Sequence, residues 1–153
     1  MGEESLESSE VRRTVVVNAA PSKVWDALTN PDSIARWMHD SELTVTSDWR
    51  AGAAIAFRGN LHGIDFANKG TIRRFETERA FEYDYWSTLS ASKLPDAPEN
   101  YTTVSFQLTP TETGTALALT LSDFPDSSVY HHAKLYWGVT LDVLKAFCEE
   151  HRP

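Results

Sequence analysis

Residues 128–150 read SVYHHAKLYWGVTLDVLKAFCEE, and the rest of the chain is interpreted around this segment. Its apolar residues recur mostly at spacings of three and four, which is typical of a helix with one buried face. They are Val129, Ala133, Tyr136, Trp137, Leu141, Leu144 and Cys148. A helix of this span measures roughly 33 Å at 1.5 Å per residue. It is therefore long enough to cross a whole sheet, and Asp126 or Ser127 can cap its first turn.

Strand character dominates the chain before this helix. In residues 101–109 and 116–122, apolar and polar residues alternate, so each strand has one covered face and one wet face, as in an antiparallel sheet. The predicted strands are residues 11–18, 43–47, 53–58, 66–75, 81–87, 101–109 and 116–122. Because the strands run together and do not alternate with helices, the fold class is α+β.

Two short helices are predicted between the first two strands. Pro21 opens the first, which carries the apolar patch Val24, Trp25 and Leu28. Asn30 can cap the second, which has Pro31 at its first position and runs to about residue 37. One long helix on a large curved sheet can leave space beneath it, and the short helices can close one end of that space.

The length of 153 residues suits one domain, assigned to residues 11–150, and no repeat or linker divides it. Residues 1–10 hold four glutamates and one leucine, so we expect a disordered acidic tail. This tail lacks the apolar stretch of an export signal, and the lone Cys148 cannot form an internal disulfide. Both features favour a cytoplasmic location.

Charge and hydropathy argue against two classes of partner. The chain carries 14 Lys and Arg against 22 Asp and Glu, a net charge of −8. This field repels nucleic acid and anionic membrane surfaces. No apolar run approaches the roughly 20 residues that span a bilayer, so stable membrane association is not expected.

Three groups of residues resemble a known family in their order and spacing. They are Ala19–Trp25 (AAPSKVW) with ALTNP at 27–31 and Trp37, then Gly70–Phe75 (GTIRRF), then Trp137, Leu141 and Leu144. Together they resemble the SRPBCC (START-like) superfamily, with the closest similarity to the heat-shock-protein ATPase activator-like (AHSA) subfamily. The resemblance covers about residues 11–147. It implies a helix-grip fold, in which a curved antiparallel sheet of six to seven strands wraps around the long C-terminal helix.

The family pattern has two departures here. Ala51 stands where a glycine is common, and Tyr136 stands where a glycine usually precedes the tryptophan. A large ring at position 136 narrows the cavity that the fold implies. The ligand class of the family therefore does not carry over to this chain.

The aromatic residues of the strands and the long helix have two interpretations. They can fill a solid core, since each ring buries a large apolar area. They can also line a cavity for a flat or apolar ligand, an interpretation that the fold favours for Tyr83, Tyr85, Tyr136 and Trp137. The candidate ligand-binding residues are Phe57, Phe81, Tyr83, Tyr85, Phe106, His132, Tyr136, Trp137 and Leu141.

Residues suited to catalysis are few. His132 is the one catalytic candidate, as an acid or base that the helix presents to the cavity, although a structural role is also open. Cys148, beside Glu149 and Glu150 at a helix C-terminus, is a poor nucleophile. Glu82 and Asp84 share the polar parity of their strand, so both are expected to point outward, away from the cavity. No group of residues has zinc spacing, so no metal or cofactor is expected.

Three functions remain open at this stage. The first is binding of a small hydrophobic or aromatic molecule, such as a lipid or a polyketide-like metabolite. The second is a cyclase-like enzyme in which His132 moves a proton. The third is a chaperone-partner role, which only the subfamily's name implies. The oligomeric state is also open, a homodimer included, because fold alone does not fix function.

Overall fold

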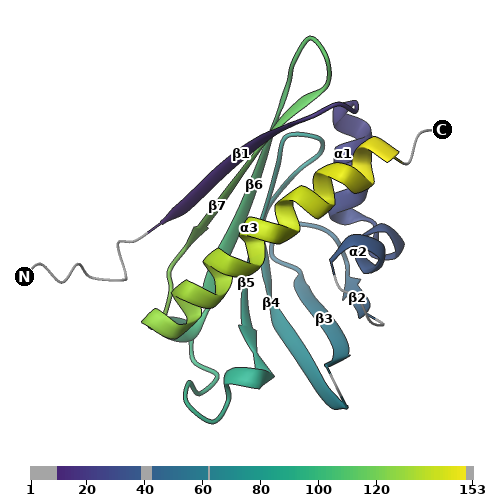
Figure 1. Cartoon of the computed structure of the whole chain (residues 1–153). Coiled ribbons are helices and arrows are strands. Elements are labelled where there is room, and N and C mark those ends of the chain that lie inside the picture. The colour runs from purple at the N-terminus through teal and green to yellow at the C-terminus, as the bar shows by residue number, and fades with distance from the viewer. Residues whose placement is uncertain (1–9, 39–42, 62, 151–153) are drawn as a thin grey trace, which may run out of the picture.

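The computed structural model describes residues 10–38, 43–61 and 63–150, and of residue 61 it describes the backbone alone. The predicted acidic tail therefore lies almost wholly outside the described residues. Seven antiparallel strands form one sheet in the order β1-β7-β6-β5-β4-β3-β2, and α3 runs diagonally across one face (Figure 1). The strands are β1 (Val11–Val17), β2 (Leu43–Ser47), β3 (Ala54–Leu61), β4 (Ile64–Glu76), β5 (Ala80–Ser87), β6 (Thr102–Pro110) and β7 (Thr115–Ser122). The helices are α1 (Pro21–Thr29), α2 (Pro31–Trp37) and α3 (Ser127–Glu150).

This arrangement confirms the predicted α+β helix-grip fold. The two short helices follow β1 and lie at one end of the sheet, and the long helix comes last (Figure 1). The predicted strand β3 is longer at its C-terminal end than the sequence pattern indicated, because it pairs with β4 as far as Leu61 and Ile64. In the described part of the chain, no helix is both long and apolar enough to cross a membrane.

The long helix α3 begins where the sequence predicted. Of the two candidate caps, Asp126 is the one used: its Oδ1 accepts a hydrogen bond of 2.8 Å from the backbone N–H of Val129. The face turned to the sheet is fully buried, and its residues are Ala133, Trp137, Thr140, Leu141, Leu144 and Cys148. Spacings of three and four thus place one continuous stripe against the inner face of the sheet.

The helices α1 and α2 seal one end of the space under α3. Trp25 of α1 packs edge-on against Phe75, with ring centroids 5.2 Å apart, and lies 6.3 Å from Phe81. Trp37 of α2 donates a 2.8 Å hydrogen bond from its indole N–H to the carbonyl of Ala27, and its ring lies 6.3 Å from that of Trp137. These contacts make this end of the interior a solid core.

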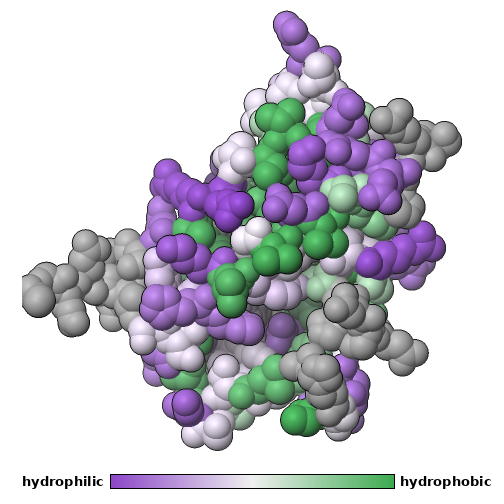
Figure 2. Space-filling view, viewed as in Figure 1, coloured by the Kyte–Doolittle hydropathy of each residue, from purple (hydrophilic) through white to green (hydrophobic). Residues whose placement is uncertain are grey.

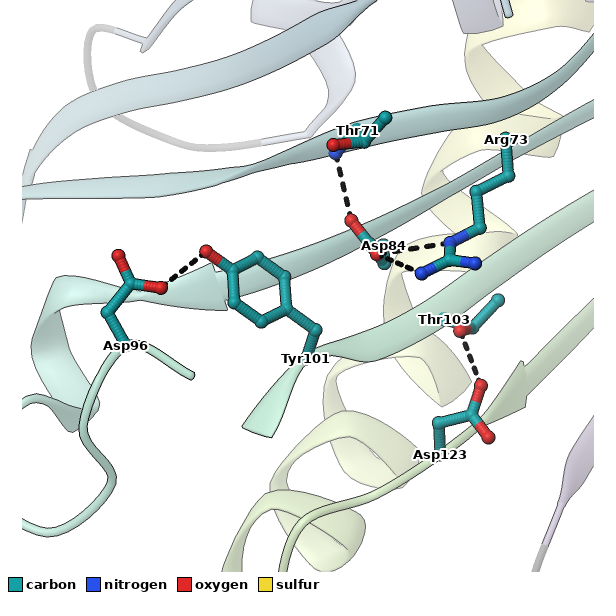
Figure 3. Close-up of polar contacts among 7 residues, drawn as sticks. All are labelled: Thr71, Arg73, Asp84, Asp96, Tyr101, Thr103 and Asp123. Carbon is teal, nitrogen blue, oxygen red and sulfur yellow. Dashed lines mark hydrogen bonds and ion pairs between the residues drawn. The ribbon is translucent and has the colours of Figure 1, made fainter. Parts of the chain in front are cut away.

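The outer face of the sheet contains a buried carboxylate. Asp84 is on this face, as its strand parity predicted, but it is only 6% exposed. Its Oδ1 accepts a 2.8 Å hydrogen bond from the backbone N–H of Thr71. Its Oδ2 accepts two from Arg73, from Nε at 3.1 Å and Nη2 at 2.7 Å (Figure 3). The carboxylate therefore binds a backbone group of the neighbouring strand and is covered by the guanidinium.

The reason for this bond lies in the pairing of β4 with β5. The register shifts between Ile72 and Arg74, so the regular ladder is interrupted there. Gly70 lies against the backbone of β5, and a Cβ at this position would be 1.8 Å from the carbonyl oxygen of Asp84. Only glycine allows the two strands to approach so closely. The Asp84 side chain then accepts the hydrogen bond from the backbone N–H of Thr71, which in a regular ladder would go to a backbone carbonyl of β5.

We expect Trp25→Ala to lower the free energy of unfolding by about 3–5 kcal/mol, because the change removes a buried ring packed on Phe75 and Phe81. Chemical denaturation monitored by circular dichroism measures this loss. A denaturation midpoint equal to that of the wild type would contradict the buried position of the ring.

Gly70→Ala should lower the free energy of unfolding by about 2 kcal/mol or more, because its Cβ can be accommodated only by separating β4 from β5. Gly138→Ala is the matched control. In α3 its Cβ meets only a guanidinium nitrogen of Arg13 at 3.3 Å, which can turn away. Alanine favours helix over glycine by about 1 kcal/mol, so this control should be neutral or stabilising. Equal destabilisation by both changes would refute the close approach at Gly70.

Candidate ligand pocket between the sheet and α3

A pocket of about 490 Å³ lies between the inner face of the sheet and the first half of α3. Strand residues that line it include Phe57, Asn68, Tyr83, Tyr85 and Trp86. Residues of α3 that line it are Ser128, Val129, His132, Ala133, Tyr136 and Trp137. The segment after β5 contributes Leu89, Leu94 and Asn100. Rings from the sheet and rings from the helix thus face the same space.

Six of the nine predicted site residues line this pocket: Phe57, Tyr83, Tyr85, His132, Tyr136 and Trp137. The other three, Phe81, Phe106 and Leu141, are buried in the solid core and do not line it. Strand parity correctly placed Phe81 and Phe106 on the inner face. Their position along the strand puts them nearer α1, however, where Trp25 and Trp49 cover Phe81 and where Trp137 covers Phe106.

His132 lines the pocket from α3. Its imidazole is exposed, so it lies at the rim and not in the buried part of the pocket. Its ring stacks on that of Tyr136, with centroids 6.4 Å apart and an interplanar angle of 16°. A histidine in this position can touch a ligand only at the pocket entrance.

The phenol groups of the pocket stay protonated at neutral pH. Burial raises the pKa of Tyr83 well above its ordinary value, and it raises the pKa of Tyr85 to about 12, with the nearby Tyr136 adding to the shift. The hydroxyl of Tyr136 donates a 2.6 Å hydrogen bond to the backbone carbonyl of Met38. No described residue forms a hydrogen bond with the hydroxyl of Tyr83 or Tyr85. These two phenols are therefore neutral groups with unused hydrogen-bonding capacity.

Asn68 is one of the lining residues that the sequence analysis missed. Its amide oxygen Oδ1 is buried and has no hydrogen-bond partner, the only such side-chain atom among the described residues. Asn68 stands opposite Phe57 on β3 and opposite Ser87 on β5, so it shares the inner face with the pocket tyrosines. A buried acceptor without a donor costs about 1–3 kcal/mol. The strand register could have identified it, since residues 66, 68 and 72 have the same parity.

A set of polar contacts holds the segment after β5 as the outer wall of the pocket. Asp96 accepts a 2.6 Å hydrogen bond from the hydroxyl of Tyr101 (Figure 3). It also forms an ion pair with Lys69. Lys69 also lies over the ring of Trp86, 5.8 Å from its centroid. The indole N–H of Trp86 donates a 2.8 Å hydrogen bond to the carbonyl of Leu94. These bonds fix the apolar side chains of this segment against the open side of the pocket.

Apart from His132 at the rim, the described residues that line the pocket carry no formal charge. Among the described residues that line it there is no Asp, Glu, Lys or Arg. The described residues also contain no group of three or more His, Cys, Asp or Glu side chains that could hold a metal ion. The site therefore offers aromatic surface and neutral hydrogen-bonding groups.

Comparison with known protein families identifies the chain. Residues 18–149 match the family described as activator of Hsp90 ATPase homolog 1-like protein. The chain belongs to this family. The match bears out the AHSA resemblance seen in the sequence and covers α1 to the last turn of α3. No curated protein matches the chain in sequence.

Several solved structures resemble this member of the family. ChR145 from Cytophaga hutchinsonii is 33% identical, with 94% of this chain and 95% of that chain covered and a TM-score of 0.77. A structure described as the Aha1 dimer from Colwellia psychrerythraea is 20% identical, with 92% and 96% covered and a TM-score of 0.71. CalU16 from Micromonospora echinospora is 23% identical, with 91% and 74% covered and a TM-score of 0.66. At these identities the last two show similarity of fold alone.

We expect the thiol of Cys148 to be inert in the folded protein. The side chain is buried, and burial raises its pKa to about 11, so almost no thiolate is present at pH 8. An aromatic disulfide reagent at pH 8 should release one equivalent of chromophore from the protein in denaturant and almost none from the native protein. Rapid reaction of the native protein would show that the end of α3 opens readily.

Proposed function

We propose that this protein binds a small, uncharged, flat hydrophobic molecule that carries one hydrogen-bond donor. The single observation that carries the proposal is the unpartnered oxygen of Asn68 at the wall of an otherwise aromatic pocket. A ligand that donates a hydrogen bond to this oxygen relieves the cost of a buried, unpaired acceptor. The aromatic rings around this oxygen favour a hydrophobic ligand.

Size and wall chemistry support a ligand of this class. A volume of about 490 Å³ falls within the range of roughly 300–1,000 Å³ typical of small-molecule sites. Trp137 and Tyr136 line the helix side, and Phe57 and Tyr83 line the sheet side. A planar ring system between them removes apolar surface from water on both of its faces.

The absence of charge at the described pocket wall supports a neutral ligand. A charged group in such a site would lose its hydration without gaining an ionic partner, which is costly. Tyr83 and Tyr85 remain protonated because burial raises both pKa values. They can donate to, or accept from, polar groups of a ligand near Asn68.

We expect 1-hydroxypyrene to bind about tenfold more tightly than 1-methoxypyrene, which has the same ring system but no donor. Fluorescence titration at neutral pH measures both affinities. Asn68→Leu should remove the difference between the two probes, because the acceptor is lost while the apolar wall is kept. Thermal unfolding of the variant checks that the fold is intact.

The aromatic walls should control binding of both probes. Trp137→Ala and Tyr85→Ala each remove a ring from the pocket. In variants whose thermal unfolding shows an intact fold, each should weaken binding by about tenfold, since one ring's apolar area is worth on the order of 1–3 kcal/mol. Glu82→Ala, of opposite strand parity and on the outer polar groove, is the control and should leave affinity unchanged. If neither probe binds the wild type, the proposed ligand site is refuted.

Two alternative functions have weaker support. A cyclase-like activity would use His132, the one titratable side chain among the described lining residues apart from the tyrosines, and its rim position limits it to groups at the entrance. A chaperone-partner role is supported by the description of the family alone. Conversion of a bound compound that is lost in His132→Ala would favour the first, and co-purification with an Hsp90-type chaperone the second.

Location and assembly are proposed on separate grounds. The single cysteine, which is buried and free, supports a cytoplasmic location. The similar Aha1 from C. psychrerythraea is described as a dimer, which supports a homodimer of this chain.

A further inference from the structure

Tyr136 of α3 spans the side of the pocket that faces α2. Its hydroxyl donates a 2.6 Å hydrogen bond to the backbone carbonyl of Met38, the residue that caps the C-terminus of α2. The last carbonyls of a helix lack a partner within the helix, so this bond satisfies one of them. Both residues line the pocket, and the phenol therefore forms a bridge from α3 to α2 along its wall.

Ring contacts hold this bridge in place. The ring of Tyr136 packs edge-on against Trp137, with centroids 5.3 Å apart and an interplanar angle of 88°. It also stacks on His132, with centroids 6.4 Å apart. Next to the bridge, Trp137 contacts Trp37 of α2 at 6.3 Å, and this second pair joins the two helices on the core side. Turning the phenol aside would break the bond to Met38 and both ring contacts.

Two other sides of the pocket are closed by packed or hydrogen-bonded residues. Toward α1 lies the solid core, where Phe81 and Phe106 are each 2% exposed. After β5, the indole N–H of Trp86 donates a 2.8 Å hydrogen bond to the carbonyl of Leu94 and ties that segment to the sheet. A ligand tail that outgrows the pocket therefore either displaces the phenol of Tyr136 or stays in solvent at the entrance.

We propose that Tyr136 sets the maximum length of the ligand, so that the pocket takes a compact ring compound and excludes a long alkyl chain. This inference rests on the proposed function and narrows its ligand class. A chain that displaces the phenol leaves the carbonyl of Met38 without its donor, which is unfavourable for a half-buried residue. A chain that stays in solvent buries no apolar area, so its added carbons contribute no affinity.

A series of 4-alkylphenols tests this limit. These compounds share an uncharged aromatic ring with one hydroxyl donor, and their straight tails lengthen from 4-ethylphenol to 4-dodecylphenol. Displacement of 1-hydroxypyrene, followed by fluorescence, gives the affinity of each compound. For the wild type, the affinity should rise about fourfold with each methylene that is buried and then reach a plateau.

Tyr136→Ala should move this plateau to a longer tail, because the volume vacated by the phenol takes further carbons. The longest alkylphenols should then bind at least about tenfold more tightly to the variant than to the wild type. Tyr136→Leu also removes the ring but keeps an apolar, helix-forming side chain, and it should move the plateau in the same direction even if the alanine variant is unstable. Tyr136→Phe keeps the ring and its contacts, so it should keep most of the length limit.

Tyr130→Ala is the matched control. Tyr130 is another half-buried tyrosine of α3, but its ring packs on Phe124, with centroids 5.1 Å apart, and does not line the pocket. The plateau of this variant should be that of the wild type. Thermal unfolding of each variant checks that the fold is intact.

The results separate this inference from the proposed function. If 1-hydroxypyrene does not bind the wild type, the proposed function fails and the length limit fails with it. If 1-hydroxypyrene binds but the affinity of the wild type rises without a plateau up to 4-dodecylphenol, the length limit is refuted while the ligand site stands. An equal plateau in the wild type, Tyr136→Ala and Tyr136→Leu, or a plateau lost in Tyr136→Phe, would refute the role of the ring. Failure of every alkylphenol to displace 1-hydroxypyrene would also overturn the inference.

Discussion

The packing of Trp137 across the interior is the contact on which the rest of the structure depends. From the middle of α3, its ring reaches Phe106 on the sheet, 5.7 Å away in an edge-on contact, and Trp37 of α2 at 6.3 Å. These contacts fix the height of the helix above the sheet and join the sheet to the short helices. They also divide the interior in two. On one side lies the solid core with Trp25 and Phe81, and on the other lies the pocket.

On the sheet side of the interior, the pairing of β4 with β5 is irregular. Where β4 passes β5, glycine at position 70 lets the backbones approach, and the Asp84 carboxylate binds the N–H of Thr71. The register shift follows directly after this point. Shifts of this kind bend a strand and increase its twist. Asn68 and Tyr85, which flank the irregular part of the two strands, line the pocket under the first half of α3.

The two faces of α3 differ in character. The inner face supplies rings to the pocket, whose phenols stay protonated because burial raises the pKa values of Tyr83 and Tyr85. The outer face carries the exposed apolar side chains Leu135, Val139 and Val143, seen as a hydrophobic band along α3 in Figure 2. A single helix can carry both because its 3.6-residue period gives it two separate stripes.

Local patterns in the sequence were enough to predict the architecture. Alternation in β6 and β7 and the spacing on α3 predicted which side chains face inward, since these periods follow from backbone geometry alone. They could not separate core from pocket: Phe81 and Tyr83 have the same parity, and only their distance from α1 decides which is covered by Trp25. The buried state of Asp84 and the unpartnered oxygen of Asn68 arise from pairing between strands, which no single strand encodes. The local sequence pattern thus determined the secondary structure and the side of each element that faces inward. The site was decided by the tertiary structure, because it forms where segments distant in sequence meet.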